Sequence, residues 1–446
     1  METDALSAVS LFSNCGAGDL GYAQAGFNFD VMAELDERRL AVAALNHPDT
    51  ETISGDLRET WRSVVEAYRE KNGDASPALL AACPPCQGMS SARSGRGKDN
   101  DPDAGSRDHR NLLVEVIAKV AHSLGPRVIV VENVPAFLSR VVRHPKTKDP
   151  ISAAVLLSRS LRQKYHLVPL IADLADYGVP QRRRRSFLCF VRRGEASFNE
   201  MVENGRGPFP RPTCGPSFGR EQVTIREALE SLAAGSLDAR ESALAGAGMH
   251  SVPVWGARHY AMVASIPPNS GGAAWENDDC LECGAVASAE DAECAQCNAP
   301  LPRPIVQEDG RWRLIHGFRT SSYKRMRPNA PAATITTASG HMGSDVTLHP
   351  SENRLLSPLE CAHLQTLPAD FKWGDALEKW GTTNVRAMIG EAVPPKFTKH
   401  HGQVLVGLLT GRKHRPAISM SDERVLGATQ RLAASEKAAR KAAVRE

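Results

Sequence analysis

The chain has 446 residues, of which 42% are hydrophobic and 24% are charged, and its formal net charge is +3. This composition is that of a globular protein with two or three domains, and no apolar run approaches the length of a membrane span. The N-terminus has no signal peptide, so ten cysteines indicate reduced thiols and a cytoplasmic location.

The first elements predict half of a nucleotide-binding sheet. Residues 8–12 are expected to form a buried strand, followed by a Gly-rich turn at 13–21 that leads into a helix. Glu34 ends a second strand about 20 residues later, and Asp56 follows a third. Acids at these strand ends suit the hydroxyls of a ribose, although surface acids in loops are the alternative.

A cysteine follows the fourth predicted strand, at residues 79–82. Pro84 and Pro85 stiffen the turn before Cys86, and a polar, Gly-rich segment at 91–107 comes after it. A rigidly held thiol beside a closing loop suits a nucleophile. The alternatives are a buried cysteine in a Pro-rich turn, or a redox or metal pair formed with Cys83.

Two further charged features are predicted at the same edge of the sheet. The buried parallel strand at 127–135 ends at Glu132, and an acid there is rarely buried without a partner. Residues 182–185 are four arginines, of which Arg183 and Arg185 share one face of the next strand. A surface glutamate and a solvated or phosphate-binding arginine run are the alternatives.

From about residue 193 the chain becomes rich in Pro, Gly and Ala, which marks a second region ending near 330. It contains two Cys-x-x-Cys pairs that match a four-thiolate zinc site, with a redox pair as the weaker alternative. The residues between the outer cysteines include acids but no Lys or Arg, so we expect a structural staple that repels phosphate. The predicted metal ligands are Cys280, Cys283, Cys294 and Cys297.

Basic and aromatic residues alternate after this module, from Arg311 through Trp312, Tyr323, Lys324 and Arg325 to Arg327, with His316, Phe318 and Arg319 among them. This pattern suits contacts along a nucleic-acid backbone, and a solvated basic loop is the alternative.

The remaining residues return to regular structure. A strand is expected at 333–337 and helices at 358–364 and about 396–410. The tail beyond 411 is basic and is expected to be a loosely held helix.

Six blocks stand in a characteristic order. They are Leu11-Phe12 with its Gly turn, Pro85-Cys86-Gln87, Glu132-Asn133-Val134, Gln181-x-Arg183-x-Arg185, residues 354–368 (RLLSPLECAHLQTLP) and residues 390–395 (GEAVPP). With these blocks the chain resembles the prokaryotic DNA (cytosine-5) methyltransferases, from Leu11 to about Leu409.

The resemblance implies a reaction with S-adenosylmethionine on a cytosine flipped out of duplex DNA. Cys86 would attack carbon 6 of the base, and Glu132 would hydrogen-bond or protonate nitrogen 3. Arg185, with Arg183 nearby, would orient the base, and residues 91–107 would close over it. The implied substrate-binding residues are Gln87, Ser90, Asn133 and Gln181.

The resemblance also implies a cofactor site, in which Phe12 stacks on the adenine, Glu34 binds the ribose, and Asp56 with Leu57 meets the adenine edge. The full implied set of cofactor residues is Phe12, Ser13, Asn14, Gly16, Glu34, Leu35, Asp56, Leu57 and Pro85.

The chain departs from the family pattern at three points. The family's turn reads Phe-x-Gly-x-Gly-Gly, and Asn14 and Ala17 replace two of its glycines. Asn tolerates a left-handed backbone, so we expect the turn to survive. Glu391 stands where the family usually has Asn, and a zinc knuckle is not a general family feature.

We therefore expect an α/β, Rossmann-like S-adenosylmethionine-dependent methyltransferase fold with a smaller, irregular target-recognition domain. The expected regions are 1–192 (catalytic), 193–330 (recognition, with the zinc knuckle at 280–297), 331–410 (return segment) and 411–446 (tail). The expected partner is double-stranded DNA, bound by a monomer near the nucleoid, with a cognate restriction endonuclease or a host-marking role. The alternatives are an RNA cytosine-5 methyltransferase and a non-catalytic zinc-containing DNA-binding protein.

Overall fold

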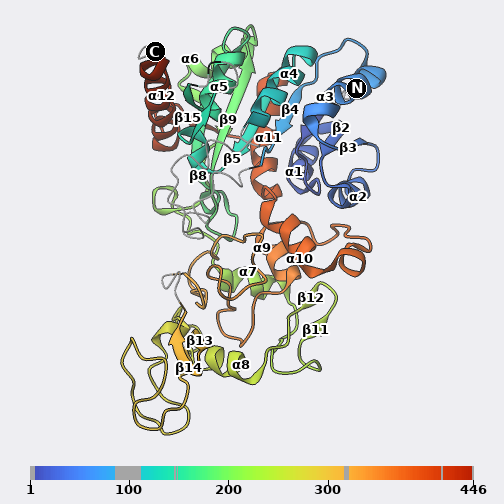
Figure 1. Cartoon of the computed structure of the whole chain (residues 1–446). Helices are drawn as coiled ribbons and strands as arrows, with labels where there is room; N and C mark the ends of the chain where they lie inside the picture. Colours follow the sequence, from blue (N-terminus) through green and yellow to red (C-terminus); the bar gives the residue numbers. More distant parts are fainter. Residues whose placement is uncertain are drawn as a thin grey trace.

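The computed structural model describes residues 6–85, 112–144, 147, 149–315, 321–412 and 415–443. These residues form two lobes: one contains a large sheet covered by helices, and the other is made mostly of loops (Figure 1). We name them the catalytic lobe and the recognition lobe after the regions expected from the sequence. The helices α9 and α10 lie where the two lobes meet.

The catalytic lobe is built on a seven-stranded sheet with the order β3-β2-β1-β4-β5-β9-β8. The first five of these strands are parallel, while β9 is antiparallel to both β5 and β8. The predicted Rossmann-like α/β class is therefore confirmed. The strands are β1 (Leu6–Leu11), β2 (Phe27–Glu34), β3 (Glu51–Ser54), β4 (Leu79–Ala82), β5 (Val128–Asn133), β8 (Tyr165–Asp173) and β9 (Arg184–Arg192).

The antiparallel strand follows from a short connection. Only the 3-10 helix η4 (Leu174–Tyr177) and a turn join β8 to β9, and a parallel crossover needs a dozen or more residues. The resulting register pairs Glu132 on β5 with Phe187 on β9. Arg185 is two residues from Phe187, so Arg185 and Glu132 are diagonal neighbours on one face of the sheet.

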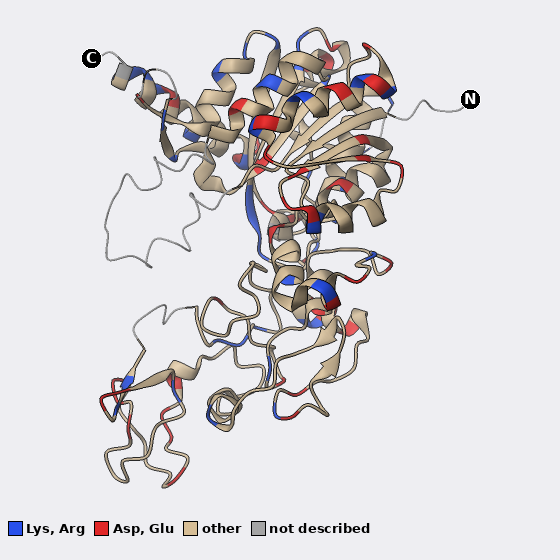
Figure 2. Ribbon diagram, turned by 45° about the vertical axis from the view of Figure 1, so that its right-hand side comes forward, with Lys and Arg blue, Asp and Glu red and all other residues tan. Residues whose placement is uncertain are grey.

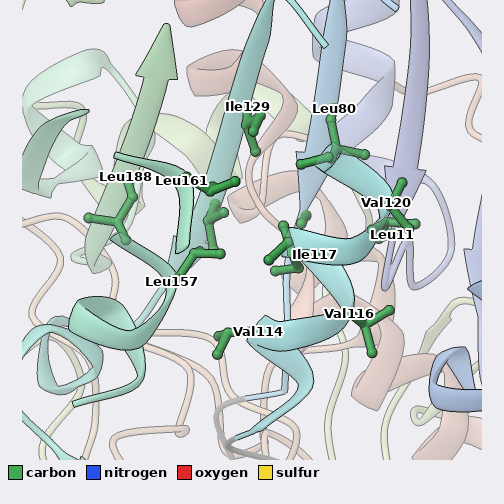
Figure 3. Packing of buried hydrophobic residues seen from close by; sticks show 14 of the residues in the cluster. Leu11, Leu80, Val114, Val116, Ile117, Val120, Ile129, Leu157, Leu161 and Leu188 are labelled. Carbon is green, nitrogen blue, oxygen red and sulfur yellow. The ribbon is translucent and has the colours of Figure 1, made fainter. Parts of the chain in front are cut away.

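Helices cover both faces of this sheet, and the parallel strands β1, β2, β4 and β5 are accordingly mostly buried, whereas the edge strand β3 is partly exposed. One face packs against α3, α4 and α5, and the other against α1 and α11. Figure 3 shows Ile117 and Val120 of α4 beside Leu80 and Leu11 of the sheet. The helices of this lobe are α1 (Ala17–Ala25), α2 (Glu37–Asn46), α3 (Leu57–Asn72), α4 (Val114–Leu124), η3 (Pro135–Leu138), α5 (Ala153–Leu161) and α11 (Pro395–Thr410).

The tail is an integral part of the catalytic lobe, so the expectation of a loosely held helix is wrong. Its strand β15 (Ala417–Ser419) pairs with β10 (Arg206–Pro210), and α12 (Glu423–Ala443) lies against β8 (Figure 1). Ala428 of α12 is fully buried in the core of this lobe. Arg424 also binds Asp176, at 2.6 Å between the guanidinium and the carboxylate.

The described residues between 193 and 330 contain few regular elements besides β10. These are α6 (Ala196–Glu203), η5 (Pro216–Phe218), α7 (Ile225–Leu232), β11 (Gly246–Ala247), β12 (His250–Ser251), α8 (Ala257–Ala264), η6 (Ala274–Glu276), β13 (Ile305–Glu308) and β14 (Arg311–Leu314). The short hairpin of β6 (Val141–Arg143) and β7 (Pro150–Ser152) belongs to the catalytic lobe but lies outside its large sheet. α6 and β10, predicted to open the recognition region, pack against α11 of the catalytic lobe instead.

The chain returns through α9 (Pro358–Leu364) and α10 (Ala376–Glu391), and α10 is broken at Gly381. The strand predicted at 333–337 is not formed. Ala332 makes a single bridge to Gln181, and the carbonyl of Ile335 accepts a hydrogen bond from the Arg183 side chain instead of from a neighbouring strand.

Candidate active site and cysteine cluster

A cavity of about 1920 Å³ lies at the carboxyl ends of the parallel strands, between the catalytic lobe and the return segment. In open α/β sheets this edge is where ligands bind. The cavity is lined by the turn after β1, the ends of β2, β4 and β5, the arginine run at the start of β9, residues between 321 and 346, and the end of α10. Most of the predicted site residues therefore share one cavity.

The turn after β1 has an unusual backbone. Phe12, Asn14 and Gly16 have φ values of 57°, 51° and 72°, in the left-handed region. A Cβ added to Gly16 would lie 2.8 Å from the His47 ring, so glycine is required there. Asn14 takes the family's glycine position as expected, and its side-chain Nδ2 donates to the carbonyl of Met388 at 2.8 Å.

The Glu34 carboxylate accepts hydrogen bonds from the backbone at this turn and at the end of β2. Its Oε2 accepts from the backbone N–H of Asn14 at 3.0 Å, and its Oε1 accepts from that of Leu35 at 2.8 Å. Asp56 caps α3 by accepting from the backbone N–H of Arg58 at 2.9 Å. The predicted cofactor residues that line the cavity are Phe12, Ser13, Asn14, Glu34, Leu35, Asp56, Leu57 and Pro85. Gly16 lies behind the turn, where its carbonyl oxygen contacts His47 Nε2.

Asp19 also lines the cavity, although its sequence position drew no attention to it. It lies in the first turn of α1, is 6% exposed, and accepts a hydrogen bond from the Ser10 hydroxyl at 2.9 Å. Burial raises the pKa of this carboxyl from 3.8 to about 7. The sequence feature that could have indicated Asp19 is an acid in the first turn of the helix that follows a Gly-rich loop.

Asp19→Asn is expected to flatten the pH dependence of stability. The unfolded chain ionises at this aspartate near pH 3.8, whereas the folded chain keeps the proton until about pH 7. Its contribution to the free energy of unfolding is therefore complete below pH 3.8 and is lost as the pH rises to 7. Urea unfolding between pH 4 and 8 should show the variant gaining stability relative to wild type as pH rises. Asp370→Asn, at an exposed site, is the control; parallel pH profiles for wild type and Asp19→Asn would contradict the assignment.

Glu132 is the charged group at the end of β5. Its Oε1 lies 3.0 Å from Arg185 Nε, and its Oε2 lies 2.7 Å from the Cys83 sulfur. Asn133, next to it, donates from Nδ2 to the carbonyl of Pro84 at 2.8 Å. The acid, the arginine and the Pro turn are thus joined, as the strand order predicts.

Arg183 and Arg185 have different partners, although they were expected to act together. The guanidinium of Arg183 is buried and donates to the carbonyls of Ile335, Gly390 and Ala392, at 2.9–3.1 Å. It thereby joins the arginine run to the return segment. Gln181 is buried as well, and donates to the Leu364 carbonyl at 2.9 Å. Arg183 and Gln181 therefore join the segment before β9 to the return segment, and both segments form walls of the cavity.

Several predicted residues lie outside the described part of the chain. They are Cys86, Gln87, Ser90 and the segment 91–107. The last described residue before Cys86 is Pro85, which lines the cavity. The roles given to these residues stay predictions.

The four cysteines of the recognition lobe come together as predicted. Their sulfur atoms all lie within 4.8 Å of one another, and the pairs Cys280–Cys297 and Cys283–Cys294 are each 3.6 Å apart. Four sulfurs placed 2.3 Å from a tetrahedral Zn²⁺ are separated by about 3.8 Å, so the cluster fits this ion.

Arg303 supports the cysteine cluster from behind. It is fully buried, and donates to the carbonyls of Asn277 and Asp291 at 2.9 and 2.8 Å and to that of Ser288. It also pairs with Asp278. One side chain therefore binds the backbone before each of the two Cys-x-x-Cys pairs, a role that spacing along the sequence does not indicate.

The basic stretch after the cluster divides into two groups. Arg325 was expected to face nucleic acid, but it is fully buried, and burial lowers its pKa to about 10. Its guanidinium donates to backbone carbonyls including those of Ile266 and His349, so it is a packing residue. Lys324 and Arg327 do line the cavity. His316, Phe318 and Arg319 lie outside the described residues.

Positive charge gathers where the lobes meet. Figure 2 shows a run of basic residues passing from the sheet toward the recognition lobe, and the arginines 182–185 line the cavity there. On β14, Trp312 packs beneath the Arg258 guanidinium, 4.8 Å from the ring centre. Among the described residues no helix is long and apolar enough to cross a membrane.

Comparison with known proteins gives matches along nearly the whole chain. The family model described as C-5 cytosine-specific DNA methylase matches residues 6–406. The type II methyltransferase M1.HgaI of Avibacterium volantium is 27% identical over 405 residues, covering 87% of this chain and 95% of that protein. The type II methyltransferase M1.BsuMI of Bacillus subtilis is 24% identical, covering 89% and 80%.

Solved structures show the same fold at lower identity. A putative DNA modification methyltransferase encoded within an Escherichia coli prophage has a TM-score of 0.54 and 19% identity, covering 91% of this chain and 99% of that one. DNMT2 of Spodoptera frugiperda has a TM-score of 0.51 and 14% identity, covering 90% and 99%.

Proposed function

We propose a covalent route for methyl transfer by this chain, which belongs to the C-5 cytosine-specific DNA methylase family and is a DNA (cytosine-5-)-methyltransferase. The observation that carries the route is the contact of Glu132 with Arg185, beside a Pro turn that is tied to Asn133. This turn leads directly to Cys86, so the nucleophile, the acid and the arginine belong to one edge of the sheet.

Carbon 5 of cytosine is a weak nucleophile, and the reaction must activate it. The Cys86 thiolate attacks carbon 6 and forms a carbon–sulfur bond, which makes carbon 5 electron-rich. Glu132 donates a hydrogen bond or proton to ring nitrogen 3 and stabilises the charge that develops there. Arg185 holds the Glu132 carboxyl and offers a positive charge beside the base. After methylation, loss of the carbon-5 proton and of the sulfur restores the aromatic ring.

The cavity suits S-adenosylmethionine, the methyl donor that family membership implies. When bound, this cofactor supplies an electrophilic methyl group. The left-handed turn at Phe12–Gly16 brings backbone close to the cavity, and Glu34 lies at its wall for a ribose. The buried Oδ1 of Asn14 has no partner among the described residues, which leaves one acceptor for a ligand.

We place double-stranded DNA between the lobes, against the arginines 182–185, Lys324 and Arg327. The target cytosine would leave the duplex to reach Glu132. The type II relatives favour a restriction-modification role, in which a cognate endonuclease cuts the unmodified site, with host DNA marking as the alternative. We expect the chain to act as a monomer, and Zn²⁺ to staple the recognition lobe through the four cysteines.

Covalent capture tests the route. Bisulfite sequencing of DNA from expressing cells first identifies the methylated site. A duplex carrying 5-fluorocytosine at that site, incubated with S-adenosylmethionine, should then form a denaturant-resistant complex, because fluorine cannot leave as the proton does.

Two variants separate the neighbouring thiols in the capture assay. Cys86→Ser should form no complex with the 5-fluorocytosine duplex, whereas Cys83→Ser should still form one. An enzyme that methylates the normal duplex but leaves no adduct on the fluorinated duplex would contradict the covalent route.

A further inference from the structure

An ion pair closes one side of the cavity. Arg39, on α2, binds Glu391, the last residue of α10, with 2.5 Å between guanidinium and carboxylate. Their side chains are 20% and 27% exposed, and both residues line the cavity. The pair therefore connects α2, which follows β2 of the sheet, to α10, which lies in the segment that returns from the recognition lobe.

A second contact joins the same two segments. Asn14 in the turn donates to the carbonyl of Met388, which lies three residues before Glu391 on α10. Both contacts use positions where the chain departs from the family pattern, with Asn14 in place of Gly and Glu391 in place of Asn. Asn14 and Glu391 thus both take part in contacts at the C-terminal end of α10.

The charges explain why Arg39 and Glu391 depend on each other. Asp36 and Glu34 both line this wall of the cavity, and Asp36 lies 3.9 Å from Arg39. Glu391 without Arg39 would add an unpaired carboxylate to an already acidic wall. A partly buried charge that loses its partner costs more than removal of both charges.

We propose that Arg39, Glu391 and Asn14 form a clasp that fixes α10 against the cofactor turn and so sets the affinity for the adenosyl cofactor. The proposal rests on the proposed use of this cavity for S-adenosylmethionine. Arg39 and Glu391 act through the position of the cavity wall and are positioning residues, whereas Asn14 both holds α10 through Nδ2 and offers Oδ1 to the ligand.

Binding of S-adenosylhomocysteine without DNA measures the clasp independently of catalysis. Arg39→Gln and Glu391→Gln should each raise the dissociation constant about tenfold, a typical size for coupling between packed segments. The double variant Arg39→Gln/Glu391→Gln should bind more tightly than Arg39→Gln, because Arg39→Gln alone leaves Glu391 as an unpaired carboxylate on an acidic wall. Glu391→Gln leaves Arg39 with Asp36 as its remaining partner. Asn14→Gly fits the left-handed backbone and should weaken binding a few-fold by losing one hydrogen bond. In steady state, KM for S-adenosylmethionine should rise by a larger factor than kcat falls.

A matched ion pair on the same helix serves as the control. Lys379 and Asp375 are 2.7 Å apart at the other end of α10 and are exposed. Lys379→Gln should leave the dissociation constant unchanged, because an exposed pair contributes little. Single clasp variants that bind like wild type, or a double variant whose loss equals the sum of the single losses, would overturn the clasp. Failure of the wild type itself to bind S-adenosylhomocysteine would instead overturn the proposed cofactor site.

Discussion

Glu132→Gln is expected to lower kcat by about 10²- to 10⁴-fold, the usual contribution of a positioned general acid. Glutamine has the same size and can still hydrogen-bond, but it cannot give a proton to ring nitrogen 3. The orientation of the Glu132 carboxyl is fixed in the structure, because one of its oxygens contacts Arg185 and the other contacts Cys83. Single-turnover methylation of the identified DNA site measures the effect directly.

The loss of an acid–arginine pair elsewhere provides the control for this prediction. Glu436 on α12 binds Arg159 at 3.1 Å, away from the cavity. Glu436→Gln should keep the wild-type kcat. Glu132→Gln should bind S-adenosylhomocysteine as wild type does, which shows that the fold is intact. A Glu132→Gln enzyme that keeps more than a tenth of its kcat would contradict the assigned role.

Removal of zinc is expected to unfold the cysteine module while leaving the catalytic lobe folded. Residues 277–304 are all described, and they contain neither helix nor strand. The buried apolar cluster of the module is only Cys280, Cys294 and Leu301, so its own core cannot hold it together. Binding of Zn²⁺ to four-ligand modules contributes about 10–16 kcal/mol, which is enough to decide whether such a module folds.

Limited proteolysis distinguishes the two states of the module. The segment carries Glu282, Glu290 and Glu293 but no Lys or Arg between the outer cysteines, so a glutamate-specific protease is the suitable probe. Chelation, or Cys294→Ser, should open this segment to cleavage and weaken binding to duplex DNA, while S-adenosylhomocysteine still binds. One metal ion per chain is expected. Unchanged resistance to the protease after full removal of metal would contradict a structural zinc.

Local sequence patterns predicted those features that depend on neighbours along the chain. Short continuous apolar runs indicated the buried strands of the sheet, and their carboxyl ends placed Glu132 at the cavity. Paired Cys-x-x-Cys spacing likewise predicted the four-sulfur cluster. In each case the physical cause lies within a few residues of the feature it produces.

The features that escaped prediction depend on what lies across the fold. Arg183 and Arg185 look equivalent on one strand face, yet one reaches the carbonyls of Gly390 and Ala392 and the other reaches Glu132. Arg325 stands in a basic stretch but is enclosed by carbonyls that approach from other segments. The partner of a long side chain is set by tertiary packing, which strand or helix periodicity does not encode.

The distance along the chain between the members of the clasp has a consequence for synthesis. Asn14 and Met388 are 374 residues apart, so the turn, which is made first, has no partner until α10 has been synthesised. At 5–20 residues per second this delay is about 20 to 75 s. The wall of the cavity beside Asn14 is therefore completed only after α10 has been synthesised. A chain truncated before α10 should therefore bind S-adenosylhomocysteine more weakly than the full chain does.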